Sequence, residues 1–503
     1  MSEKQSAAEH RSKPTCAQFR SFVASGWAQR TSGPTPREPV ADHTGARREA
    51  IGTHFTAERL VIPAGGLKVR SNDCDYVFRP HTAFAHLTGL GSDREPDAVL
   101  VLEPVDDGSH EATIYFRPLA GRDTEEFFGD ARYGEFWVGA RPTLEDVESE
   151  LGISARHIDE LKDAVSKDAG EVRIRVVRDA DAEITALVDE IRQQTAKMQA
   201  DSGDERDYGD DDELGRVLST QRMVKDSFEI DRMRDAVSAT ARGFEAVIAD
   251  LPDAVRRGRG ERWVEGVFGL TARHEGNGVG YDSICAAGNH ATTLHWIRNT
   301  GDLRDGDLLL LDAGVEVDSL YTADITRTLP ANGRFSDPQR RVYDAVYAAQ
   351  EAGLAAVRPG ATFSDIHNAA IRSIAETLFD WGLLPEGVDV EATLDKETGQ
   401  YHRRWMVHGT SHHLGLDVHD CARARDKDYM QGTLTPGMIL TVEPGLYFKV
   451  DDELIPSELR GIGVRIEDDV LVTETGHENL SGFMPRSSSE VEDWIARVWE
   501  EQR

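Results

Sequence analysis

Strand-like and helix-like hydrophobic patterns alternate along the chain from about residue 51. Residues 97–103 and 112–116 are short apolar runs of the kind found in buried strands, and residues 172–177 alternate apolar and polar side chains. Helical stretches lie between these runs. The pattern predicts a small α/β domain over residues 51–180.

A second series of patterns opens with long amphipathic helices. Asp226 and Glu229 have the spacing of a capping box, and the apolar positions after them recur at helical intervals. A further helix is expected to begin at Asp337, as its N-cap, with Pro338 in the first turn. Another helix carries apolar residues at four-residue steps, namely Ile366, Ala370, Ile374 and Leu378. Strand-like runs separate and follow these helices, which predicts an α+β domain over residues 226–490.

The remaining segments show these hydrophobic patterns only in small part. Residues 1–50 are polar and rich in Arg, Ser, Thr and Pro, as is typical of a flexible arm. Residues 181–225 join a helical stretch to the acidic run 201–213. That run lacks the spacing of a calcium-binding loop, so a helical and acidic linker is expected. Residues 491–503 are expected to form a C-terminal tail.

Composition and charge narrow the function classes. The chain has a mean hydropathy of −0.47 and no run of 18 apolar residues, and its first residues lack the apolar core of a secretory signal, so a cytoplasmic location is expected. The net charge of −33 argues against nucleic acid or an anionic membrane as a partner. The four cysteines have no paired spacing and are expected to be reduced thiols.

Two acids stand on neighbouring strand-like runs. Asp312 ends the apolar run 306–312, and Asp324 lies in the run 320–329, where alternation places it on one face with threonines. A hairpin of these runs would bring both carboxylates together, and their repulsion would require a raised pKa or a cation. Asp312 by itself could also cap the following turn.

Two more acids lie on strand-like runs further along the chain. Glu443 ends the β run 438–443, directly before a Pro-Gly turn. Residues 461–470 alternate, so that Arg465 and Glu467 share the face opposite the apolar positions. An ion pair between Arg465 and Glu467 would explain both residues, but three other strand-borne acids favour a metal role for Glu467.

Histidines are concentrated between residues 407 and 420. The segment contains His408, His412, His413 and His419. Gly409 and Gly415 disfavour a continuous helix, which excludes the helical zinc signature His-Glu-x-x-His. Histidines of this kind can simply hydrogen-bond the backbone, but their density favours a site. One histidine with the four acids would form an oxygen-rich cage able to hold two divalent cations.

Several motifs together resemble a known family. They are the segments 294–296 (LHW), 311–314 (LDAG), 323–328 (ADITRT), 408–420, 441–445 (TVEPG) and 465–467 (RIE). In order and spacing they resemble the pita-bread metallopeptidases, which include methionine aminopeptidase, prolidase, creatinase and aminopeptidase P, and they are most similar to aminopeptidase P. The resemblance implies a pita-bread catalytic domain preceded by a smaller α/β, creatinase-like amino-terminal domain, to which residues 78–118 are similar.

The resemblance also implies a division of the metal ligands. Asp312 would bind one cation, His412 and Glu443 the other, and Asp324 and Glu467 both. A carboxylate has two oxygens and can bridge two ions, whereas a neutral imidazole serves one. Four oxygen-donor residues and one nitrogen donor favour Mn²⁺, the metal that the resemblance implies as well.

The resemblance assigns the catalytic roles too. Two cations would activate a shared water, and Glu443 would carry its proton to the departing nitrogen. Substrate contact or stabilisation of the oxyanion would fall to His295, His408 and His419. Tyr281 and Arg465 would hydrogen-bond the metal ligands. His413 stands where members of the family often carry an aromatic residue.

The implied activity is that of an aminopeptidase acting on peptides with proline in second position. Prolidase, which cleaves Xaa-Pro dipeptides, is the alternative, although Ser411 and the amino-terminal domain favour the aminopeptidase. An alternative of another class is a catalytically silent binding module with the same fold. Creatinase is disfavoured because all five ligand positions are filled. A homodimer or homotetramer is implied.

Overall fold

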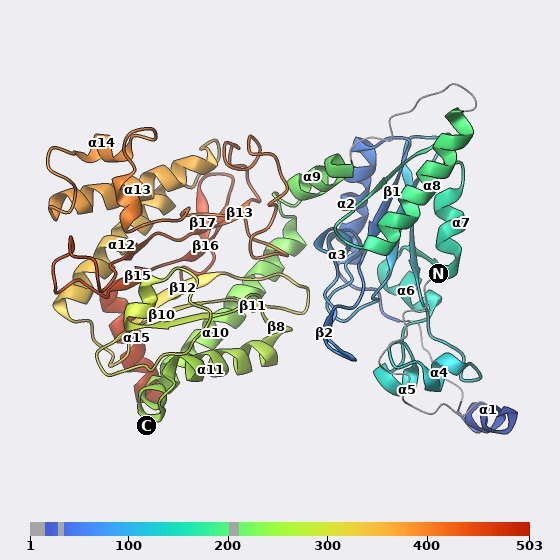
Figure 1. The fold of residues 1–503 in the computed structure, drawn as a ribbon, viewed down its shortest axis with the longest axis horizontal. Coiled ribbons are helices and arrows are strands. Elements are labelled where there is room, and N and C mark those ends of the chain that lie inside the picture. The colour runs from blue at the N-terminus through green and yellow to red at the C-terminus, as the bar shows by residue number, and fades with distance from the viewer. Residues whose placement is uncertain (1–15, 29–34, 201–210, 503) are drawn as a thin grey trace. The chain divides into compact units, whose positions relative to one another are not determined.

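The structure, a computed structural model, describes residues 16–28, 35–200 and 211–502 (Figure 1). The chain divides into two compact units, residues 1–218 and 219–503, called here the amino-terminal and the carboxyl-terminal unit. Helix α9 (Asp211–Gln221) spans the boundary between them. In the described residues, no helix combines the length and the apolar character needed to cross a membrane.

A mixed sheet with the strand order β6-β5-β4-β1-β7 forms the centre of the amino-terminal unit. Its strands are β1 (Glu58–Pro63), β4 (Val99–Pro104), β5 (His110–Phe116), β6 (Ser154–His157) and β7 (Arg173–Val176). A separate hairpin joins β2 (Val69–Ser71) and β3 (Cys74–Asp75). The helical elements are α1 (Ala17–Ala24), α2 (Ala41–His54), α3 (Thr82–Thr88), α4 (Glu125–Gly129), α5 (Glu135–Val138), α6 (Leu144–Leu151), η2 (Ile158–Glu160), α7 (Leu161–Ser166) and α8 (Ala182–Ala200).

Alternating side chains give this sheet two apolar faces. Leu60 and Leu100 face one hydrophobic cluster, while Val61 and Val101 face the other. Both faces are therefore covered, which explains why the strands read as nearly continuous apolar runs. The three strands predicted from these runs are confirmed as β4, β5 and β7.

Within residues 1–50, helices form where the sequence showed no period. The stretch 1–50, expected to be a flexible arm, includes α1 and most of α2 in its described part. Helix α2 buries Thr44 and Arg47 as well as Ile51, and these polar side chains conceal its inner face from a hydrophobicity pattern. In the expected linker, the predicted helical stretch is confirmed as α8, which packs Val188 and Ile191 into the second cluster. Residues 201–210 of the acidic run lie outside the described residues.

Small sheets and long helices make up the carboxyl-terminal unit. The sheets have the orders β12-β10-β9, β11-β8, β13-β16-β17 and β14-β15. The strands are β8 (Gly278–Val279), β9 (Ile284–Ala287), β10 (Leu308–Ala313), β11 (Val315–Glu316), β12 (Ile325–Pro330), β13 (Ile439–Val442), β14 (Gly445–Tyr447), β15 (Gly463–Arg465), β16 (Asp468–Val472) and β17 (His477–Asn479). The helical elements are α10 (Ser227–Arg257), α11 (Gly260–Glu275), η3 (Gly288–Thr292), α12 (Asp337–Ala356), α13 (Phe363–Asp380), α14 (Val390–Leu394), η4 (Tyr401–Arg404) and α15 (Ser488–Glu501).

The predicted helices of this unit are confirmed. Helix α10 begins after its N-cap Asp226 with the expected capping box, and α13 buries all four apolar positions of its stripe. Helix α12 has Ser336 as its N-cap, one residue before the expected Asp337. Helix α10 packs against α11 and α12 against α13, and the strands lie between these pairs in Figure 1. The expected C-terminal tail belongs to α15, which buries Trp494 in the unit.

Two strand predictions change in detail. The run 320–329 becomes a strand only at Ile325, because Leu320 has a positive φ of 72° and the backbone N–H of Thr322 donates to Gly415 instead of to a strand neighbour. The alternating run 461–470 divides into β15 and β16, which belong to different sheets. Glu467 stands at that break, where its backbone forms an isolated bridge with Thr326.

Candidate metal centre

The hairpin of β10 and β12 brings the first two acids together. The strands pair antiparallel with Ala313 opposite Ile325, so Asp312 and Asp324 flank one end of the ladder, and the predicted hairpin is confirmed. The hydroxyl of Tyr281 lies 2.7 Å from Oδ1 of Asp312 and 2.5 Å from Oδ1 of Asp324. Tyr281 thus contacts both carboxylates, as expected for a residue that orients them.

His412 approaches Asp324 from the other side. Its Nε2 lies 3.3 Å from Oδ2 of Asp324 and 3.8 Å from Oε1 of Glu443. The backbone before His412 runs along β13, since Thr441 N donates to His412 O and Glu443 N donates to Thr410 O. The Nδ1 atom faces the carbonyl oxygen of the next residue at 3.1 Å, which directs Nε2 toward the acids.

Glu467 completes the group. The hydroxyl of Thr326 donates to Oε2 of Glu467 at 2.7 Å, and Glu467 N donates to Thr326 O. Donor atoms of Asp324, His412 and Glu467 all lie within 4.8 Å of one another. The structure therefore places these three predicted ligands in one cluster, with Asp312 and Glu443 in contact with it through Tyr281 and His412.

Buried negative charge dominates the electrostatics of the cluster. Burial raises the pKa of Asp312, although Arg465 opposes the shift, and it raises the pKa of Glu443 to about 8 against the opposing effect of His412. Burial and the neighbouring acids raise the pKa of Glu467 well above its usual range. Carboxylates packed this closely require compensating positive charge. A hard donor set with one imidazole fits divalent cations, so the residues suit the predicted metal site.

A chain of hydrogen bonds runs from Asp312 to His408. Nη2 of Arg465 donates to Oδ2 of Asp312, and Nη1 donates to the hydroxyl of Tyr447 at 3.0 Å. That hydroxyl lies 2.7 Å from Nε2 of His408, whose Nδ1 lies 2.6 Å from the carbonyl oxygen of Gly409. Burial and the charge of Arg465 lower the pKa of His408 to about 3, so its ring is neutral with the hydrogen on Nδ1.

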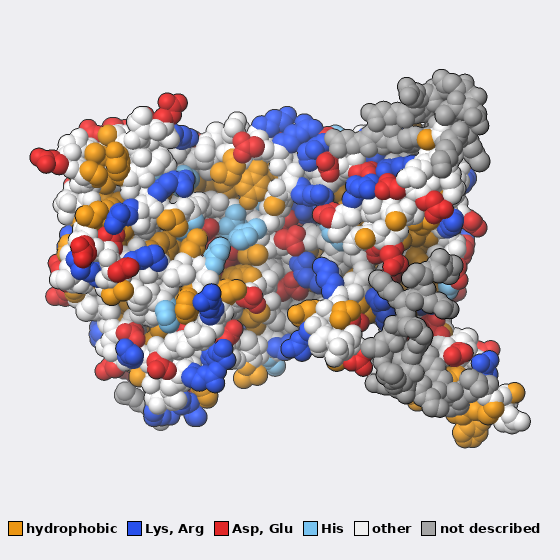
Figure 2. Space-filling view, in the orientation of Figure 1, with side chains coloured by type: hydrophobic (Ala, Val, Ile, Leu, Met, Phe, Trp, Pro, Cys, Tyr) orange, Lys and Arg blue, Asp and Glu red, His pale blue; other side chains and the backbone are white. Residues whose placement is uncertain are grey.

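His419 lies against His412, and His295 acts electrostatically on His408 and His419. The His419 ring is perpendicular to that of His412 with 4.5 Å between centroids. Burial lowers the pKa of His419, and the charges of His412 and His295 add to the shift. His295 also lowers the pKa of His408, after burial and other neighbours. Figure 2 shows histidine side chains gathered in one patch on the visible face of the unit, beside hydrophobic side chains.

One buried carboxylate holds the loop that carries His295. Glu261, at the start of α11, is fully buried and accepts hydrogen bonds from both ends of the loop, at Ala287 N (2.8 Å) and Gly301 N (2.5 Å). It also accepts from Trp296 Nε1 (2.9 Å) and contacts His290 Nδ1 at 2.7 Å. The loop beside His295 is therefore tied to α11 at four points.

His413 has an aromatic role instead of a role in the cluster. Its ring is stacked on Phe363, with 5.2 Å between centroids and 20° between planes, and meets Tyr429 edge-on at 4.7 Å. Burial lowers its pKa to about 3, so the ring is neutral. His413 thus fills the place of an aromatic residue.

Sequence reasoning missed two polar residues next to the predicted ligands. Tyr447 is the last residue of β14, the strand that comes after Glu443. The buried carboxylate of Asp469 accepts a hydrogen bond from Asp324 N. Asp469 lies two residues after Glu467, so alternation from that ligand would have indicated it. Tyr447 gives no such signal, because the turn at Pro444 interrupts the strand.

Comparisons with known proteins agree with this geometry. Residues 231–474 match Metallopeptidase family M24, and residues 44–176 match the Aminopeptidase P, N-terminal domain. The Xaa-Pro aminopeptidase 1 of Streptomyces coelicolor is 52% identical over 478 residues, covering 95% of this chain and 91% of the relative. Xaa-Pro aminopeptidase 2 of the same organism is 49% identical, covering 96% of each chain. A solved structure of Escherichia coli aminopeptidase P in complex with substrate superposes with a TM-score of 0.78 at 30% identity, covering 92% of this chain and 100% of that one.

Proposed function

Because this chain belongs to metallopeptidase family M24 and has the amino-terminal domain of aminopeptidase P, we propose that it is an Xaa-Pro aminopeptidase. The expected architecture, a pita-bread catalytic domain behind a smaller α/β domain, is confirmed by the same matches. The substrate would be a peptide with proline in second position, cleaved after its first residue. The observation that carries this proposal is the cluster of Asp324, His412 and Glu467 in a chain so similar to proteins of that name.

We assign the five ligands to two divalent cations, for which we propose Mn²⁺. Asp312 would bind one ion, His412 and Glu443 the other, and Asp324 and Glu467 both. The central position of Asp324 supports the bridging role, since one of its oxygens faces Tyr281 and the other faces His412. When bound, the cations would supply the positive charge that lowers the pKa of a water and polarises the peptide carbonyl.

Glu443 is the residue that we propose to move the proton. It is largely buried beside the cluster, and its Oε2 lies 3.4 Å from Nδ1 of His408. A carboxylate beside the activated water can take a proton from it and pass that proton on. The water oxygen would bond to the carbonyl carbon, the carbon–nitrogen bond would break, and the proline nitrogen would receive the proton held by Glu443.

The histidines would orient the peptide. The His419 ring contacts that of His412, His408 contacts Glu443, and the neutral ring of His408 is fixed by Tyr447. We propose that the rings of His295, His408 and His419 hydrogen-bond the substrate and stabilise the charge that develops on its carbonyl oxygen. Tyr281 and Arg465 would act behind the ligands, because they hydrogen-bond Asp312.

Prolidase is the second candidate function. Comparing hydrolysis of an Xaa-Pro dipeptide with that of a tripeptide of the form Xaa-Pro-Xaa tests the choice. Release of the first residue from the tripeptide supports the aminopeptidase. Hydrolysis confined to the dipeptide would replace it with prolidase.

A silent binding module would be expected to lose ligands, whereas this chain retains all five and belongs to an enzyme family. Two expectations stay predictions. They are a cytoplasmic location, which cell fractionation tests, and a homodimer or homotetramer, which analytical ultracentrifugation tests.

A further inference from the structure

The metal ligands stand on segments of several separate sheets. Asp312 and Asp324 border the sheet of β10 and β12, Glu443 follows β13 of another sheet, and Glu467 lies between β15 and β16. The backbones of the first sheet and the Glu467 segment meet at an isolated bridge, with Thr326 opposite Glu467. Side-chain contacts also join these segments, among them those of Arg465 with Thr326 and Asp312.

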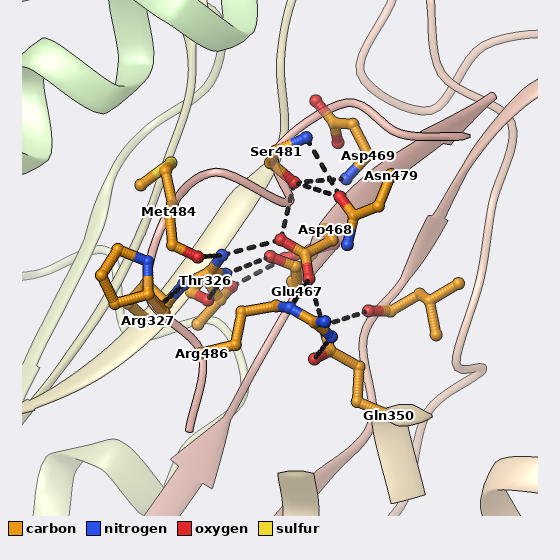
Figure 3. Close-up of polar contacts among 12 residues, drawn as sticks. Thr326, Arg327, Gln350, Glu467, Asp468, Asp469, Asn479, Ser481, Met484 and Arg486 are labelled. Carbon is orange, nitrogen blue, oxygen red and sulfur yellow. Dashed lines mark hydrogen bonds and ion pairs between the residues drawn. The ribbon is translucent and has the colours of Figure 1, made fainter. Parts of the chain in front are cut away.

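Arg327 lies at that bridge. Its side chain is fully buried, and Nη1 donates to both carbonyl oxygens of the bridge, to Thr326 O at 2.9 Å and to Glu467 O at 2.6 Å (Figure 3). Nη2 donates to Oδ1 of Asp468 at 2.7 Å. One guanidinium thus holds the backbones of β12 and of the Glu467 segment together.

Asp468 connects this pair of backbones to the segment that carries Glu443. It faces away from the cluster, since it follows Glu467 in an extended chain, and its side chain is fully buried. Its Oδ2 accepts from Nε2 of Gln350 at 2.9 Å, and the same Nε2 lies 3.3 Å from the carbonyl oxygen of Val442, directly before Glu443. Two further donors satisfy Asp468, the hydroxyl of Ser481 at 2.6 Å and the guanidinium of Arg486 at 3.5 Å (Figure 3).

We propose that Asp468 and Arg327 are positioning residues of the metal centre, which hold Asp324, Glu443 and Glu467 at the spacing that cations require. The proposal rests on the metal site proposed above. Neither residue would touch an ion or the substrate. They act through the backbones of the ligand segments, as partners beyond the direct ligands do in other metal sites.

A purely structural ion pair makes a different prediction. If the pair contributed only to folding, replacing Asp468 would lower stability and leave the metal affinity of the folded protein unchanged. The pair Arg340–Glu492 in the same unit provides the matched control, because Glu492 is likewise buried, with Arg340 at 2.6 Å and Phe335 N at 2.8 Å, but connects α15 to the start of α12.

The test is Mn²⁺ binding by isothermal titration calorimetry to the full-length protein after chelation, with circular dichroism to confirm folding. Asp468→Asn keeps the shape and removes the charge, and we expect Mn²⁺ affinity to fall by about 10- to 100-fold, with activity partly restored by excess Mn²⁺. Glu492→Gln should stay within about twofold of the wild type. Equal affinity in Asp468→Asn, or an equal loss in Glu492→Gln, would overturn the proposal.

Two milder variants keep the proposal testable if Asp468→Asn does not fold. Gln350→Met keeps the volume and removes the contact with Val442 O, and Arg327→Lys keeps the charge and loses the double contact at the bridge. Both should weaken Mn²⁺ binding, and unchanged affinity in both would reject a positioning role. Wild-type protein that binds no Mn²⁺ would instead reject the proposed metal site itself, so the two failures are distinguishable.

Discussion

The hydroxyl of Tyr447 lies 2.7 Å from Nε2 of His408, and this contact fixes the ring nitrogen that carries the hydrogen. The same hydroxyl accepts from Arg465, so its proton points toward the histidine. Nδ1 of His408 is therefore the donor, directed at Gly409 O and, at 3.4 Å, at Glu443. Tyr447, which was not among the predicted site residues, thus determines the tautomer of His408, which was.

Removing that hydroxyl should impair catalysis more than folding. Tyr447→Phe leaves Nη1 of Arg465 without its partner and lets the His408 ring rotate, so we expect kcat/KM for a tripeptide to fall by about tenfold. Tyr343→Phe is the control, because it also removes a buried hydroxyl contact, with Arg486 O at 2.8 Å. Steady-state kinetics that show equal losses in both variants would contradict the assigned role.

Replacing the central acid should abolish turnover. Asp324→Asn removes a charge and one strong metal-binding oxygen, so metal content measured by mass spectrometry should fall and kcat should drop by more than about a hundredfold, which exceeds the loss typical of an outer partner. Circular dichroism should stay unchanged. Asp395→Asn, in an exposed turn outside the cluster, should behave as the wild type. Full turnover in Asp324→Asn would exclude a bridging role.

Acid should destabilise the fold partly through His367. Burial lowers the pKa of this histidine from 6.5 to about 4, where its Nδ1 lies 3.3 Å from the hydroxyl of Thr410. Between these two pH values the unfolded chain binds a proton at His367 and the folded chain does not. The free energy of unfolding therefore decreases as the pH falls from about 6.5 toward 4. At about pH 5 the cost is about 2 kcal/mol.

His367→Gln removes this titration. Urea unfolding at about pH 7.5 and about pH 5 should show a smaller loss of unfolding free energy in the variant than in the wild type, by about 2 kcal/mol. Identical losses would show that His367 is protonated in the folded protein.

The loop that carries His295 should depend on Glu261. Glu261→Gln replaces one accepting oxygen by an amide group that faces donors. Because Ala287 N and Gly301 N bind different oxygens, the substitution disrupts one of these two contacts. We expect KM to rise by several-fold, about fivefold, with a smaller change in kcat, because the loop would lose position while the ligands stay in place. Unchanged kinetics in the folded variant would mean that the loop does not contact substrate.

Local sequence patterns predicted much of the framework and of the site. Apolar runs indicated β4, β5 and β10, and their terminal acids indicated Asp312 and Glu443, because a buried strand that ends in a carboxylate leaves it at an edge. The capping box at Asp226 located the start of α10. These features depend only on residues that are close in the sequence, so a local sequence pattern can predict them.

Features that depend on distant contacts escaped the sequence. The break at Glu467 exists because Thr326 pairs with it across sheets, and nothing within 461–470 indicates that partner. Arg465 shared a predicted face with Glu467, yet its guanidinium pairs with Asp312. Helix α2 was missed because its inner face includes Arg47. The side chain of Arg47 donates to the carbonyl oxygen of His86, which belongs to the next helix, α3.

The distribution of the ligands over separate sheets has a consequence for biosynthesis. The first acid stands at Asp312 and the last at Glu467, and no shorter piece of the chain contains the full donor set. On the proposed assignment of the ligands, a nascent polypeptide would not capture both ions until residue 467 has left the ribosome and the sheets have docked. Metal uptake should accordingly report the completion of folding, and an ion supplied to a truncated chain should find only isolated, weakly binding carboxylates.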